Sequence, residues 1–79
     1  MPYGLPAAIT LSRYEWAFAL DRKDEDGTSM TVIIPEGTII FPKYKLADHD
    51  GEWLCTDRQG KRLVILEEKL RLSVPSRPA

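Results

Sequence analysis

The sequence predicts an all-β fold, a small barrel of five to six short antiparallel strands. Short runs of β-branched and aromatic residues recur at regular spacing, and glycine, proline or aspartate separates one run from the next. The composition agrees, because 43% hydrophobic and 29% charged residues in a chain of 79 residues are the balance of one small globular domain. The alternative is an α+β fold, with one helix at about residues 13–23 packed on an antiparallel sheet.

The first predicted strand covers residues 14–21, where large apolar side chains alternate with small or charged ones. This period of two is typical of a half-buried strand, and it places four large side chains on one face: Tyr14, Trp16, Phe18 and Leu20. Ser12 and Glu15 stand at the spacing of a helix capping box, which favours the helical alternative. A helix scatters the four large side chains over more than one face, so we predict the strand.

Four more strands follow at short intervals: residues 30–34, 38–41, 52–56 and 61–66. The segments between them contain the residues that tight turns prefer: Pro35-Glu36-Gly37, Asp48-His49-Asp50-Gly51 and Asp57-Arg58-Gln59-Gly60. Proline punctuates both ends of the chain. We therefore predict a single β-rich domain at residues 8–74 between two flexible tails, residues 1–7 and 75–79.

The pieces that follow residue 49 resemble the Src-homology-three-like superfamily of small β-barrels. Asp50-Gly51-Glu52-Trp53-Leu54-Cys55 looks like the tryptophan-bearing strand of this family, and Arg58-Gln59-Gly60-Lys61 is similar to its distal turn. Later segments are similar to the family's next strand, its one-turn helix and its closing strand: residues 63–65, 67–70 and 71–74. The resemblance implies a small barrel over about residues 14–74.

The resemblance does not extend to the groove with which members of the family bind polyproline helices. The family's first aromatic run corresponds to Ala17-Phe18-Ala19-Leu20-Asp21, which has no tyrosine, and Leu54 stands where the family has a second tryptophan. Residues 67–70 contain neither the proline nor the tyrosine of the family's pattern. We therefore do not expect polyproline recognition.

Residues for catalysis or metal binding are few. His49 is the only histidine and Cys55 the only cysteine, and their contact would require the loop to fold back on its strand. We expect Cys55 to be a small core residue instead. Asp48-His49-Asp50 offers too few ligands for a firm metal site, and the five glycines are too dispersed for a phosphate-binding loop. We predict a protein that is not an enzyme and needs no metal or cofactor.

The net charge of −1 conceals a division along the chain. Residues 1–42 carry three basic and six acidic side chains, whereas residues 43–79 carry eight basic and six acidic ones. We expect one loop of the first half to present its carboxylates to a basic surface of a larger partner: Asp21, Asp24, Glu25 and Asp26. Trp53 and Tyr44 are expected to add an aromatic rim. The simpler interpretation of the same loop is a hairpin turn that its charges keep solvated.

These features favour a non-catalytic protein–protein interaction module, a monomer or small homo-oligomer in the cytoplasm of a bacterium or an infected host. In size and charge, though not in motif, the chain resembles small inhibitors encoded by phages or mobile elements. Among these, anti-CRISPR proteins commonly block a nucleoprotein by occupying its basic groove. No apolar run approaches the roughly 20 residues that cross a bilayer, so no membrane partner is expected.

Two other functions are consistent with the sequence. In the first, the barrel binds nucleic acid directly through basic residues of the second half: Lys43, Lys45, Arg58, Lys61 and Arg62. In the second, the protein is an oligomeric structural or accessory component whose strands between Met30 and Phe41 pair at an exposed edge.

Overall fold

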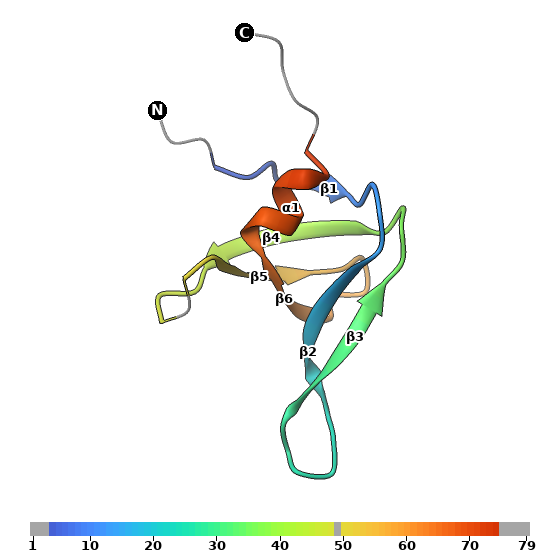
Figure 1. Ribbon diagram of the computed structural model, residues 1–79, viewed down its shortest axis with the longest axis vertical. Coiled ribbons are helices and arrows are strands. Elements are labelled where there is room, and N and C mark those ends of the chain that lie inside the picture. The colour runs from blue at the N-terminus through green and yellow to red at the C-terminus, as the bar shows by residue number, and fades with distance from the viewer. Residues whose placement is uncertain (1–3, 49, 75–79) are drawn as a thin grey trace, which may run out of the picture.

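Six antiparallel strands and one short helix make up the part of the chain that this computed structural model describes, residues 4–48 and 50–74 (Figure 1). In chain order the elements are β1 (Ile9–Thr10), β2 (Glu15–Lys23), β3 (Ser29–Ile34), β4 (Ile39–Lys45), β5 (Glu52–Thr56), β6 (Arg62–Leu66) and α1 (Glu67–Leu72). The predicted all-β class with five to six antiparallel strands is confirmed. The alternative helix at residues 13–23 is wrong, because β2 occupies this segment.

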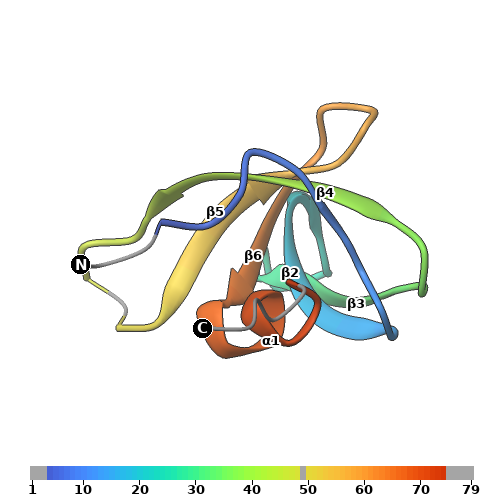
Figure 2. The same cartoon turned by 90° about the horizontal axis from the view of Figure 1, so that it is seen from above.

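The strands form one sheet in the order β1-β4-β5-β6-β2-β3, in which every neighbouring pair is antiparallel. The sheet curls, so that β4 lies across from β2 and β3 while β5 and β6 connect the two sides (Figure 2). Strands β1 and β3 stand at the two ends of this order, and no pairing between them closes the sheet within the described residues. The curl therefore leaves an opening beside β3.

One face of the curled sheet, together with α1, encloses the core. Ten buried apolar residues form it: Ile9, Leu11, Ala17, Ala19, Ile34, Ile40, Cys55, Leu63, Ile65 and Leu70. The half-buried pattern predicted for β2 is confirmed, but its buried side holds Glu15, Ala17 and Ala19, whereas Trp16 and Phe18 face outward. The concave side of a curled sheet has little volume for each residue, so alanines fit there beside the larger side chains of β6 and α1.

Strands β2 and β3 form a hairpin that projects from the rest of the sheet (Figure 1). At its tip, the backbone N–H of Gly27 donates to the carbonyl of Asp24 at 3.0 Å, and Gly27 has a φ of +79°. A left-handed residue at this position costs little only when it is glycine. The acidic loop expected after the first strand is therefore the tip of a projecting hairpin.

The end of the domain differs from the expected closing strand at residues 71–74. Helix α1 continues to Leu72, with Glu67 and Glu68 in its first turn and Lys69 and Arg71 in its last, an arrangement that suits the helix dipole. Leu70 is fully buried, which fixes the helix on the core. The sixth strand is instead β1, which pairs with the start of β4; two residues are too short a run for a pattern of period two to indicate.

The predicted tails lie partly beyond what the structure describes, since residues 1–3 and 75–79 are outside the described ranges. Leu5, which belongs to the predicted N-terminal tail and is described, packs against the core cluster. The described part of the chain contains no helix that is long and apolar enough to cross a membrane.

Candidate protein-binding surface

The face of the sheet that points away from the core is also apolar. Residues that pair directly across antiparallel strands share a face. The pairs Trp16–Ile33 and Phe18–Val64 join β3, β2 and β6, and Leu54, which pairs with both Val64 and Tyr44, continues this face onto β5 and β4. We call this set the outer face: Trp16, Phe18, Ile33, Tyr44, Leu54, Val64 and Leu66.

The outer face combines exposed rings with covered aliphatic side chains. Trp16 and Phe18 are 58% and 49% exposed, whereas Val64 and Leu54 are only 6% and 9% exposed. Between the rings and Leu66 lies an open hollow of about 230 Å³, with Val64 in its lining. A chain rarely exposes a contiguous apolar surface of this kind unless another molecule covers it. The outer face therefore has the features of a docking surface.

The predicted acidic residues are only partly brought together. Asp24, Glu25 and Asp26 lie at the tip of the β2–β3 hairpin, where all three are exposed, and we call them the acidic tip. One carboxylate oxygen of Asp24 accepts hydrogen bonds from the backbone N–H groups of Asp26 and Thr28, at 2.9 and 3.0 Å. Asp24 thus shapes the turn, and the charges of Glu25 and Asp26 remain available to a partner.

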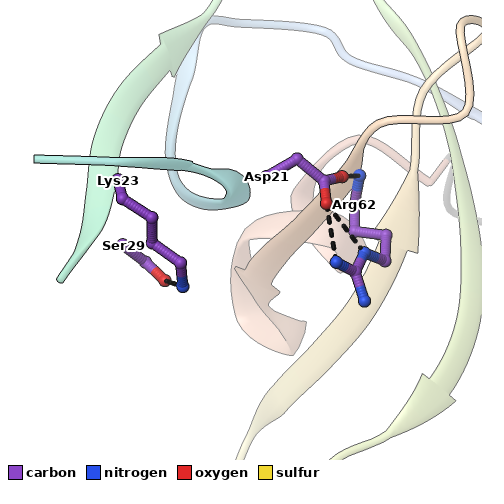
Figure 3. A network of polar contacts seen from close by, with 4 residues as sticks. All are labelled: Asp21, Lys23, Ser29 and Arg62. Atoms are coloured by element: carbon purple, nitrogen blue, oxygen red, sulfur yellow. Dashed lines mark hydrogen bonds and ion pairs between the residues drawn. The ribbon is translucent and has the colours of Figure 1, made fainter. Parts of the chain in front are cut away.

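Asp21, the fourth predicted acidic residue, lies within β2 and is paired with Arg62 of β6 (Figure 3). The Arg62 Nη2 and Nε atoms donate to Asp21 Oδ1 at 2.6 and 3.1 Å, and the Arg62 backbone N–H donates to Oδ2 at 3.0 Å. These hydrogen bonds lower the pKa of Asp21 and raise that of Arg62. The two residues neutralise each other and tie β2 to β6 near the base of the hairpin.

The five predicted basic residues do not form one patch. Lys45 lies opposite Trp53 at the start of β5, and its Nζ is 3.5 Å from Glu67 Oε1. Arg58 and Lys61 belong to the β5–β6 turn, at the other end of β5. The remaining two are otherwise engaged: Arg62 with Asp21, and Lys43 with the Phe41 ring, whose centroid lies 5.9 Å from Lys43 Nζ.

The expected aromatic rim of Trp53 and Tyr44 is divided between the two faces of the sheet. Tyr44 is 56% exposed on the outer face. Trp53 packs against the core cluster, and its indole Nε1 donates to Glu67 Oε1 at 2.7 Å. Only Tyr44 of this predicted pair lies where it can contact the same partner as the outer face.

Cys55 is fully buried, as expected for a small core residue. Burial raises the pKa of its thiol to about 12, so the nucleophilic thiolate is scarce at neutral pH. His49, the only histidine of the chain, lies outside the described residues. In the described part of the chain, no three histidine, cysteine, aspartate or glutamate side chains gather as a metal site would require.

Comparisons of this chain with protein-family models, with curated proteins and with solved structures gave no match. The resemblance to Src-homology-three-like barrels remains a prediction from the residues alone. The description of the outer face likewise rests on the burial and strand pairing of this chain and not on any similar protein.

Sequence reasoning assigned no binding role to Phe18, Ile33 or Leu66. The signal was present in Trp16-Ala17-Phe18-Ala19, where two rings alternate with two methyl side chains. Alternation shows that a strand has two unlike faces, but large side chains on one face do not decide that this face is inside.

Proposed function

We propose that this chain is a non-catalytic protein-binding module that docks through its outer face. The observation that carries the proposal is the exposure of Trp16 and Phe18 beside an apolar hollow with Val64 in its lining. Tryptophan is among the residues that contribute most to protein interfaces, especially when it stands next to a pocket that a partner can fill. A partner side chain that enters the hollow covers both rings and excludes water from them.

The β2–β3 hairpin supports a second part of the proposal, which concerns the charge of the partner. Strand β2 carries Trp16 and Phe18 toward the base of the hairpin, and the acidic tip lies in the loop at the hairpin's far end. Carboxylates at the edge of an interface attract a basic surface and accelerate association more than they strengthen the final complex. The partner we propose has an apolar projection bordered by lysine or arginine side chains.

A nucleoprotein fits this description, because the surface that holds its nucleic acid is basic. We extend the proposal to an inhibitor of such a complex, of the kind that phages and mobile elements encode, acting in the cytoplasm of a bacterium or an infected host. Direct nucleic-acid binding is the less favoured alternative, since Arg62 and Lys45 are paired with carboxylates and the five predicted basic residues do not form one patch. Titration with short RNA and DNA at low salt tests this alternative, which predicts an affinity that falls steeply as salt rises.

The experiment that tests the docking surface uses the chain and a Trp16→Ala/Phe18→Ala double variant as matched baits in extracts of the source organism. Both side chains are exposed, so circular dichroism should show the same fold for the two baits. We expect a protein that the wild-type chain retains and the double variant loses. Equal retention of every protein by both baits contradicts the proposal.

With the purified partner, single variants measure the contribution of each feature. Trp16→Ala should weaken binding about thirtyfold, the effect typical of an interface hot spot, while Tyr14→Ala should leave the affinity nearly unchanged. Tyr14 is a suitable control because it is 61% exposed and precedes β2. Glu25→Lys/Asp26→Lys should slow association at low salt with little effect on dissociation; an effect confined to dissociation contradicts the steering role.

A further inference from the structure

An open cleft of about 440 Å³ lies beside the unpaired edge of the sheet, apart from the hollow of the outer face. One wall consists of β3 from Val32 onward, the β3–β4 turn and Ile39, and the other consists of the β5–β6 turn with Arg62. Ala19 and Leu63, which belong to the core cluster, also line it. The cleft therefore lies where the curled sheet stays open.

The charges that line this cleft leave a surplus of free cations. Arg22, Arg58 and Lys61 are exposed, and their side chains make no hydrogen bond or ion pair with any described residue. Of the two carboxylates in the lining, Asp21 is neutralised by Arg62. Asp57 accepts hydrogen bonds at Oδ1 from the backbone N–H groups of Gln59 and Lys61, at 2.8 and 3.0 Å, and keeps its charge, which the three exposed cations outnumber. A ligand with negative charge is therefore favoured.

Strand β3, which lines the cleft from Val32 to Ile34, has one edge whose main-chain groups pair with no other strand of the described residues. It is the last strand of the sheet, and only β2 pairs with it in the described part of the chain. Natural edge strands often prevent further pairing with charged side chains or proline. The sequence of β3, Ser-Met-Thr-Val-Ile-Ile, contains neither. An unprotected edge of this kind accepts an added strand.

We propose that this cleft binds an extended peptide with acidic side chains, which pairs with β3 through its main chain. Alternate side chains of a strand point to opposite sides, so carboxylates of the peptide can reach Arg58 and Lys61 while apolar side chains cover Ala19 and Leu63. Main-chain pairing supplies affinity, and the two cations select acidic over basic peptides. This cleft shares Ile33 with the outer face but none of the residues that line the hollow there, so its occupancy does not depend on the function proposed above.

The test uses the whole chain and two labelled synthetic peptides, Thr-Glu-Val-Glu-Val-Thr and Thr-Lys-Val-Lys-Val-Thr, with both ends capped. Fluorescence anisotropy at low salt should show binding of the glutamate peptide and at least tenfold weaker binding of the lysine peptide. Arg58→Glu/Lys61→Glu should reverse this preference. Lys43→Glu, an exposed lysine outside the cleft, is the matched control and should change neither affinity by more than about twofold.

Strand pairing is tested on the peptide, so that no substitution disturbs β3. The glutamate peptide is made with N-methyl groups either at its odd or at its even positions, which blocks the N–H groups of one edge at a time. One of the two peptides should lose binding and the other keep it, and amide resonances of residues 29–34 should shift on binding. Equal behaviour of the two peptides, an unaltered preference in the charge-reversed variant, or a dimer joined through β3 that excludes the peptide each overturns the proposal.

Discussion

Glu67 connects α1 to the sheet, and its replacement should measure how strongly the helix is held. Its Oε1 accepts the Trp53 indole N–H at 2.7 Å and lies 3.5 Å from Lys45 Nζ, while its Oε2 accepts from Arg71 Nε at 3.1 Å. One carboxylate thus joins β5, β4 and the next turn of its own helix. Glu67→Gln keeps the size and one acceptor oxygen but removes the charge.

The hydrogen bonds from Trp53 and Arg71 hold the pKa of Glu67 at about 2, well below its ordinary value of 4.5, with Lys45 acting in the same direction. Because the folded pKa is lower than the unfolded one, the carboxylate stabilises the fold above about pH 4.5, and this contribution is lost as the pH falls toward 2. Each pKa unit is worth about 1.4 kcal/mol, so the lowering from 4.5 to about 2 sets an upper limit of about 3.5 kcal/mol. The side chain is 25% exposed, so solvent screening reduces the expected contribution to about 1–2 kcal/mol.

Urea unfolding followed by circular dichroism at pH 7 and pH 2.5 tests this reasoning. Glu67→Gln should lower the free energy of unfolding by about 1–2 kcal/mol at pH 7, and most of the difference should vanish at pH 2.5. Glu68→Gln is the matched control, because Glu68 also lies in the first turn of α1 and is exposed. A loss as large in Glu68→Gln, or one that persists unchanged at pH 2.5, would refute the network as its cause.

Three other substitutions or reagents probe the core and a turn. Iodoacetamide at pH 8 should leave Cys55 unmodified until urea is added, because burial raises its pKa to about 12; rapid alkylation of the folded chain, seen by mass spectrometry, is the contrary result. Glu15→Met should raise the free energy of unfolding by about 1–3 kcal/mol, since Glu15 Oε2 is buried with no partner among the described residues; a destabilised variant in urea titration contradicts this. Gly60→Ala should cost about 1 kcal/mol through its φ of +82° alone, because the new methyl group meets no atom within 4 Å. Gly4→Ala, equally uncrowded but without a positive φ, should unfold at the same urea concentration as the wild type.

Local sequence patterns predicted most of the strands and turns, and they failed where contacts between distant residues determine the secondary structure. The turn at residues 57–60 was predictable, because Asp57 and Gly60 provide the hydrogen bonds and the backbone freedom of the turn within four residues. Strand β1 was not predictable from the sequence, because it is defined only by the pairing of Ile9 and Thr10 with β4, about thirty residues away in the chain. The end of α1 was mistaken for a strand because burial of Leu70, which fixes the helix, depends on the core around it.

In the candidate surfaces, too, features set by local sequence were predictable and features set by distant contacts were not. The acidic tip was predictable from its composition, but the pairing of Asp21 with Arg62 joins residues 41 positions apart and removes one residue from each predicted set. The outer face was not predictable, because alternation along β2 shows two unlike faces without indicating which of them lies inside. In β2 the small residues lie inside, because the curl of the sheet determines how much volume each face has.

Strand β3 contributes to both proposed surfaces, but through different parts of the strand. Ile33 belongs to the outer face, whereas the free edge of the same strand borders the cationic cleft. One surface uses apolar side chains and the other uses main-chain groups with Arg58 and Lys61, so a substitution in one should not alter the other. Trp16→Ala should therefore leave the affinity for the glutamate peptide unchanged, and Arg58→Glu/Lys61→Glu should leave retention of the partner protein unchanged. If each variant weakened the binding of both ligands equally, the two surfaces would act as one site and the proposed independence would be wrong.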